Sequence, residues 1–90
     1  MGKEKEPQAA EAGRALSQNL IRFRRRAGLS QQGTADRAGI HRTHVSMIER
    51  GERLPRLDTI VKLGGALEVE PCALLMGMVW KLDPPKAGLK

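Results

Sequence analysis

Glycine and proline divide the middle of this 90-residue chain into segments that are each long enough for only a short helix. Gly28, Gly39 and Gly51 each follow an apolar pattern of helical spacing, and Pro55 and Pro71 each open the next one. No segment shows the two-residue alternation of a half-buried strand. The sequence therefore predicts an all-α fold, a compact bundle of about five short helices.

The apolar spacing also sets the expected bounds of these helices. Leu16, Leu20, Phe23 and Ala27 form one stripe, which predicts a first helix from residue 14 to residue 27. Ser30 is a good N-cap for the second helix. The second and third helices are expected at residues 31–38 and 42–50, and the fifth from Pro71 through Leu75. A fourth helix is expected after Pro55, with an apolar stripe of Leu57, Ile60, Leu63 and Leu67.

Both ends of the chain lack such a pattern. Residues 1–13 combine alternating charges with Pro7 and small residues, which is typical of a disordered tail, and residues 83–90 look similar. One domain over residues 14–82 remains. A domain of this size buries only a modest core, so a large active-site cleft is not expected.

Positive charge is concentrated in one part of the chain. Lysine and arginine outnumber aspartate and glutamate 16 to 10, for a net charge of +6. All ten arginines lie between residues 14 and 56, where there are only three acidic residues. A cationic patch of this kind favours a polyanionic partner.

Cysteine content and hydropathy indicate where the protein works. Cys72 is the only cysteine, so the chain can form no intrachain disulfide or thiolate cluster, and we expect a small buried thiol in a cytoplasmic protein. The start of the chain has no signal-peptide core. The longest apolar run, "CALLMGMVW", is nine residues, about half of what a membrane-spanning helix needs. No metal or cofactor is expected.

Two short helices joined by a glycine turn, the second polar and cationic on its outer side, outline a helix-turn-helix. The stretch "LIRFRRRAGLSQQGTADRAGIHRTHVSMIERGERLPRLDTIVKLGGAL" resembles the Cro and phage-repressor (XRE) type of helix-turn-helix domain, which has the lambda-repressor-like fold. The shared pattern is an arginine four residues before Gly-Leu-Ser-Gln, then Ala-x-x-Ala-Gly, Ser-x-Ile-Glu-x-Gly, Pro and Leu-x-Thr. The resemblance covers residues 14 to about 75.

This resemblance implies a sequence-specific transcriptional regulator, a repressor in our interpretation, that binds a palindromic operator in double-stranded DNA as a homodimer and is not an enzyme. The helix over residues 42–50 would enter the major groove. By the same resemblance the base-reading residues are Arg42, Thr43, Ser46 and Met47. The phosphate-contacting residues are Gln31, His41, Arg50 and Arg53.

Arg24 and Glu49 match a structural pair of the family that joins the first helix to the end of the third. Glu49 is therefore interpreted as an acid that orients the reading helix. Three features depart from the family pattern. Thr34 stands where leucine is usual, His41 stands where serine or threonine caps the reading helix, and glycines interrupt the second and fourth helices.

A single reading helix contacts few bases, and two half-sites about 34 Å apart double the contacts, so we expect a twofold dimer. The candidate surface is apolar and follows the fifth helix, because a small core cannot cover so many large side chains. It consists of Leu75, Met76, Met78, Val79, Trp80 and Leu82. Trp80 could instead close the end of the core.

Four alternative functions have weaker support in the sequence. His41 and His44, beside Glu49, could form a metal or nuclease site, although no further ligand lies nearby. The same domain also occurs in antitoxins, whose tails bind a toxin, and in controller proteins of restriction–modification systems. RNA binding is disfavoured because the chain has one Phe, one Trp and no Tyr to stack on unpaired bases.

Overall fold

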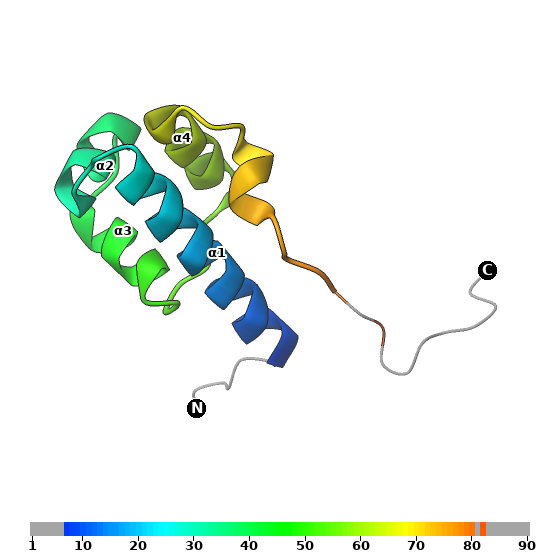
Figure 1. Cartoon of the computed structure of the whole chain (residues 1–90). Helices are drawn as coiled ribbons and strands as arrows, with labels where there is room; N and C mark the ends of the chain where they lie inside the picture. The colour runs from blue at the N-terminus through cyan, green and yellow to red at the C-terminus, as the bar shows by residue number, and fades with distance from the viewer. Residues whose placement is uncertain (1–6, 81, 83–90) are drawn as a thin grey trace.

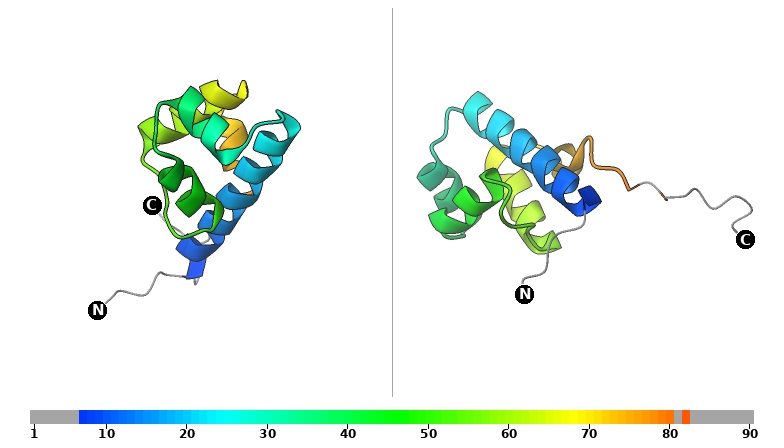
Figure 2. Two further views of the ribbon diagram at one scale, coloured as in Figure 1. Left: turned by 90° about the vertical axis from the view of Figure 1, so that its left-hand side faces the viewer. Right: turned by 90° about the horizontal axis from the view of Figure 1, so that it is seen from below.

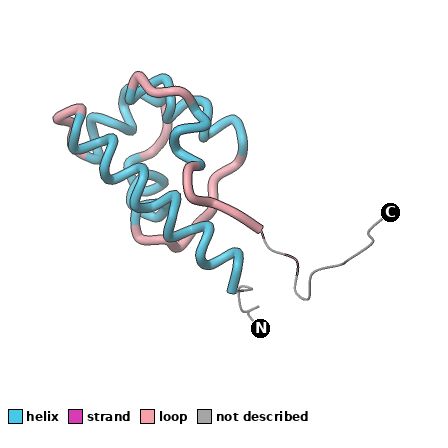
Figure 3. Tube along the Cα trace, turned by 45° about the vertical axis from the view of Figure 1, so that its right-hand side comes forward, coloured by secondary structure: helices cyan, strands magenta, loops and turns pink. Residues whose placement is uncertain are grey.

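The computed structural model describes residues 7–80 and 82. Within this part of the chain every element is helical, and Figure 3 shows no strand there. The prediction of an all-α fold is confirmed. The elements are α1 (Pro7–Arg26), α2 (Gln31–Ala38), α3 (Arg42–Glu49), α4 (Leu57–Leu67) and the 3-10 helix η1 (Pro71–Leu75).

The helices surround one small core. α1 packs against α3 and η1, α2 packs against α3 and α4, and α4 packs against η1. Figure 1 shows α1 crossing in front of the other helices, with α2 and α3 on one side and η1 on the other, and Figure 2 shows the same arrangement from two further directions. Every element contributes to the core, which comprises Leu16, Leu20, Phe23, Ala35, Ala38, Val45, Ile48, Ile60, Leu63, Ala66, Leu67 and Leu74.

α1 begins at Pro7, seven residues before the predicted start at residue 14, so the prediction of a disordered tail is wrong for residues 7–13. Proline is well tolerated in the first turn of a helix. Further along, Gly13 is buried, and a Cβ on it would lie 3.7 Å from both the Gly51 carbonyl oxygen and Leu54 Cδ2. The early part of α1 therefore underlies the turn after α3. The predicted tail residues 1–6 and 83–90 lie outside the described residues.

The turn between α2 and α3 is built on Gly39. Its φ of 72° is left-handed, a conformation that glycine adopts without steric cost. The Ile40 amide then donates to the Ala35 carbonyl at 3.0 Å, which closes the end of α2. This turn directs the chain into α3 within a few residues.

Two of the residues that depart from the family pattern, Thr34 in α2 and Gly64 in α4, have local explanations. Thr34 is fully buried, and its hydroxyl donates to the Ser30 carbonyl at 3.0 Å, so its polar atom is satisfied. At Gly64, a Cβ would lie 3.0 Å from the Val69 carbonyl oxygen and 3.2 Å from Pro71 Cα, whereas a Cβ at Gly65 would meet open space. Gly64 thus allows η1 to approach α4.

The predicted fifth α-helix is a single stretch of 3-10 helix, which ends at Leu75. Met76 then has φ −63° and ψ 136°, Gly77 has φ 85°, and the Met78 amide donates to the Leu75 carbonyl at 3.1 Å. These values describe a type II turn over residues 75–78. Residues 76–80 follow η1 in a turn and in chain without helical structure, so the helix ends before most of the predicted dimer residues. Cys72 is exposed, contrary to the buried thiol expected.

Candidate nucleic-acid interface

The buried side of α3 determines which residues the helix presents outward. Val45 and Ile48 are buried in the core. Arg42 and Thr43 are exposed, and Ser46 and Met47 are half-buried. The four predicted base-reading residues therefore lie away from the Val45–Ile48 stripe on an eight-residue helix. A helix of this width fits the major groove of B-DNA.

α3 begins without a side-chain cap. His41 is the N-cap residue, with extended backbone angles, and its imidazole makes no capping hydrogen bond. The first amides of an α-helix have no partner within the helix, and their dipoles favour an anion. The start of α3 thus combines open amides with the exposed side chains of His41 and Arg42.

The end of α3 is fastened through Glu49. Arg24 forms two hydrogen bonds to its carboxylate, from Nε to Oε2 at 2.5 Å and from Nη2 to Oε1 at 3.0 Å. Both side chains are largely buried, with 14% and 5% of their surfaces exposed. The Ser17 hydroxyl also donates to the Glu49 carbonyl oxygen. The predicted pair of Arg24 and Glu49 is thus present, and α1 holds both the backbone and the side chain of Glu49.

Gln31 belongs to the same network. Its side-chain nitrogen donates to Glu49 Oε1 at 2.9 Å, so one of the two donors expected to contact phosphate faces the protein instead. Its backbone amide lies in the first turn of α2, where helices leave their amides without intrahelical partners. Glu49 accepts hydrogen bonds from both Arg24 and Gln31. The Gln31 side chain, which the family pattern assigns to DNA, therefore binds within the protein.

Arg50 follows α3 and is exposed, but its guanidinium is engaged. It donates to Glu52 from Nε at 2.9 Å and from Nη2 at 3.0 Å, and it also donates to the Ser46 hydroxyl. The hydrogen bond and the charge of Glu52 raise the pKa of Arg50 above its ordinary value. Arg50 therefore stays protonated, while Glu52 offsets part of its charge.

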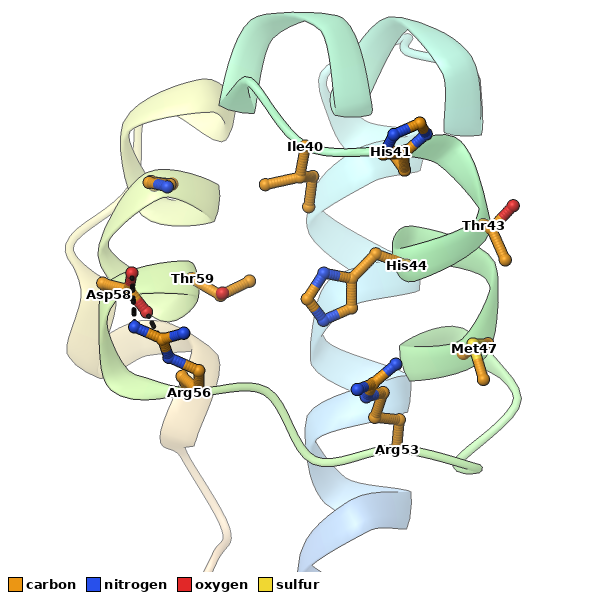
Figure 4. Close-up of a pocket in the computed structure, with 10 residues that line it drawn as sticks. Ile40, His41, Thr43, His44, Met47, Arg53, Arg56, Asp58 and Thr59 are labelled. Atoms are coloured by element: carbon orange, nitrogen blue, oxygen red, sulfur yellow. Dashed lines mark hydrogen bonds and ion pairs between the residues drawn. The ribbon is translucent and has the colours of Figure 1, made fainter.

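A shallow cavity of about 500 Å³ lies between α3, the following loop and α4. Thr43 and Met47 border it, so it is continuous with the outer face of α3. In Figure 4, His44 projects from α3 into the space between the two helices, and Arg53 extends from the loop toward it. Five basic side chains line this cavity: His41, His44, Arg53, Arg56 and Lys62.

One carboxylate shares this cavity. Asp58, in the first turn of α4, pairs with Arg56 at 3.4 Å between Oδ1 and Nε. Both side chains are more than half exposed, so the pair is solvated and weakly coupled. The basic side chains still outnumber the acid, and the cavity offers an anion several cationic donors.

Comparison with known proteins connects this geometry to a family. The pattern of the helix-turn-helix family (HTH_3) matches residues 20–74, more than half of the chain. The chain belongs to this family of DNA-binding transcriptional regulators. The match includes α2, the Gly39 turn and α3, together with the Arg24–Glu49 pair.

Relatives within the helix-turn-helix family include control proteins. C.SmaI of Serratia marcescens is 37% identical over 60 residues, which are 67% of this chain and 71% of that protein. C.BamHI of Bacillus amyloliquefaciens is 44% identical over 50 residues, which are 56% of this chain and 62% of that protein. The crystal structure of the restriction–modification controller protein C.AhdI from Aeromonas hydrophila superposes with a TM-score of 0.67 at 39% identity, over 69% of this chain and 94% of that one.

Within this helix-turn-helix domain, the structure brings only some of the predicted DNA-contacting residues together. His41, Thr43, Met47 and Arg53 share the cavity, whereas Gln31 is turned to the Glu49 network. Sequence reasoning missed three of the five basic lining residues. They are His44, Arg56 and Lys62.

The missed residues differ in how visible they are in the sequence. His44 lies one turn beyond His41 and was weighed only as a metal ligand. In the part of the chain that the structure describes, no group of three His, Cys, Asp or Glu residues could hold a metal ion. Arg56 is the N-cap residue of α4 and Lys62 lies in the middle of that helix. They come near the outer face of α3 only because α2 packs against both α3 and α4.

The apolar segment after η1 is exposed. Met76, Val79 and Trp80 expose 60%, 67% and 62% of their surfaces, and Leu75 and Leu82 are also exposed. Met78 alone of the predicted dimer residues packs against the core. Trp80 therefore does not close the end of the core. None of the described helices is both long and apolar enough to pass through a membrane.

Proposed function

We propose that this helix-turn-helix protein is a repressor that binds a palindromic operator in double-stranded DNA as a homodimer, with α3 in the major groove. The observation that carries this proposal is the outer face of α3. Its polar side chains project from a helix that a buried ion pair holds at one end, and a cationic cavity lies directly beside them. A rigid reading element flanked by phosphate-binding groups is what sequence recognition requires.

Each residue of the outer face has a chemical role in this proposal. Arg42 is exposed and can donate two hydrogen bonds to the O6 and N7 atoms of a guanine. Thr43 can contact a thymine methyl group or donate to a base edge. Ser46 and Met47 face the groove at the next turn, where the Ser46 hydroxyl is oriented by Arg50.

Phosphate contacts would come from both sides of α3. Arg53 and His41 keep the roles that the sequence predicts, and Gln31 keeps its role through its backbone amide. Arg50 would reach a phosphate by exchanging its solvent-exposed contact with Glu52. His44, Arg56 and Lys62 join them on the cavity side. Each phosphate neutralised would add about −0.9 to the slope of log affinity against log salt concentration.

The lack of charged side chains in and directly after η1 supports the homodimer. Residues 71–80 contain no charged side chain, in a chain of net charge +6. In a twofold contact the same patch occurs on both copies, so a charge near the axis would lie close to its own like charge. By contrast, the exposed Leu57 and Val61 of α4 alternate with Arg56, Asp58 and Lys62, which are solvated. The uncharged segment is the better self-complementary surface.

Titration of duplex DNA with two variants tests the reading role of α3. Arg42→Ala should weaken binding to the preferred duplex by about 1–3 kcal/mol and relax the preference at one base pair. Arg53→Ala should weaken all duplexes alike and reduce the salt slope by about 1. An equal loss on every sequence for both variants would exclude base reading by Arg42.

A controller protein of a restriction–modification system is the second candidate. Two relatives are named control proteins, and the similarity to the controller C.AhdI spans nearly all of that chain. On this proposal the operator would lie beside endonuclease and methyltransferase genes. Binding of the purified protein to DNA upstream of such genes, next to its own coding sequence, would support it. A coding neighbourhood without either gene would exclude it.

A further inference from the structure

We propose that Asn19 is a positioning residue for dimerisation. From α1, it holds the chain at the point where η1 ends, so that the apolar segment of residues 75–80 has one conformation before a second copy binds it. This inference rests on the homodimer proposed above. It assigns a role to a buried polar side chain that neither the core nor the DNA-reading face uses.

The hydrogen bonds of Asn19 carry the inference. Its side chain is nearly buried, with 5% of the residue exposed, and its amide nitrogen donates to the Leu74 carbonyl at 2.9 Å and to the Met76 carbonyl at 2.8 Å. A primary amide has two N–H donors, so both are used on one short stretch of backbone. Arg22 Nη2 donates to the remaining oxygen at 3.2 Å. Any shift of the segment would leave buried donors without partners.

The turn after η1 is the second feature that fixes the conformation of the apolar segment. The two carbonyls bound by Asn19 flank Leu75, which is the first residue of the type II turn, and Gly77 supplies the left-handed position of that turn. The Met78 amide closes the turn on the Leu75 carbonyl. The hydrogen bonds of Asn19 therefore hold the turn against α1, and Gly77 allows the left-handed backbone that the turn requires.

Burial alone does not hold the segment after η1 in one conformation. Leu74 is fully buried, but beyond it only Met78 packs against the core. Met76, Val79 and Trp80 project into solvent, so core packing does not order them. A surface that is ordered before association loses less conformational freedom when a partner binds. In a second copy the same segment would present the same uncharged side chains, as twofold contact requires.

The test compares Asn19→Ala with Arg22→Ala in the full chain. Asn19→Ala removes both backbone bonds, whereas Arg22→Ala removes only the partner of the amide oxygen. For Asn19→Ala we expect the dimer dissociation constant, measured by sedimentation equilibrium, to rise about tenfold or more, because two hydrogen bonds are lost. In the dilute monomer, exchange of the Met76 and Met78 amides, which donate to the Ala73 and Leu75 carbonyls, should become about tenfold faster, with α2 and α3 unchanged. Arg22→Ala should match the wild type in both measurements.

A folded Asn19→Ala chain with unchanged exchange and an unchanged dissociation constant would overturn the positioning role alone. A wild-type chain that stays monomeric at all concentrations would overturn the homodimer as well, while the Arg42 titration would still report on DNA reading. If Asn19→Ala does not fold, Gly77→Val strains the turn from the solvent side, where its Cβ would meet no atom within 4 Å. Weaker dimerisation of a stable Gly77→Val chain would support the inference, and dimerisation as tight as the wild type would refute it.

Discussion

The two surfaces to which we assign function are both fastened to α1, but by different chemistry. The end of α3 is held by the buried pair of Arg24 and Glu49, by Ser17, and by core side chains of α3 itself. The segment after η1 is held by the two neutral hydrogen bonds of Asn19 and by a turn. The reading helix is therefore expected to lose its position only when the domain unfolds, whereas the dimer segment can loosen while the domain stays folded.

The largest effect is expected at Glu49. Glu49→Ala leaves the Arg24 guanidinium largely buried without its carboxylate, which should lower the free energy of unfolding by about 3–5 kcal/mol. Urea denaturation measures this loss. Glu52→Ala is the matched control, because its exposed ion pair with Arg50 should contribute only about 0–1 kcal/mol. If both variants lost a similarly small free energy of unfolding, α3 would be held no more firmly than the segment after η1.

Trp80 should show the opposite behaviour. Trp80→Ala removes an exposed side chain, so the free energy of unfolding of the monomer should change by no more than about 0.5 kcal/mol. Dimerisation should weaken by about 2 kcal/mol or more, as for a buried aromatic residue at an interface. Sedimentation equilibrium and urea denaturation on the same samples separate the two quantities. A destabilised monomer with an unchanged dimer would place Trp80 in the core instead.

Gly64 and Gly65 of α4 test how closely η1 packs against α4, because only Gly64 faces η1. Gly64→Ala would force a Cβ against the Val69 carbonyl and Pro71, and should destabilise the fold by about 1–3 kcal/mol. Gly65→Ala meets open space and should stabilise α4 by up to about 1 kcal/mol. Thermal unfolding of the two variants measures the difference. Equal effects would mean that η1 is not held close to α4.

Local patterns predicted much of this molecule. The bounds of α2, the apolar stripe of α4 and the Arg24–Glu49 pair follow from spacing, caps and the family motif. Each depends on residues that are near in sequence or strongly patterned. The left-handed Gly39 turn is of the same kind. These features depend on local sequence patterns, so they can be predicted without a structure.

Other features depend on contacts between distant segments, and the sequence could not reveal them. α1 extends back to Pro7, and on this extension Gly13 packs beneath the turn after α3. Asn19 contacts the backbone more than fifty residues later. Arg56 and Lys62 line the same cavity as α3 residues only because α2 packs against both α3 and α4. The type II turn at Gly77 was not predicted, because it depends on the contacts of Asn19 with the Leu74 and Met76 carbonyls.

Selection of binding sites from random duplex DNA tests the central claim most directly. With the wild-type chain at moderate salt concentration, we predict enrichment of palindromic sequences whose two half-sites have centres about 34 Å apart on one face of the helix. Enrichment of a single asymmetric half-site would contradict the homodimer. The absence of any enriched sequence would contradict base reading by the outer face of α3.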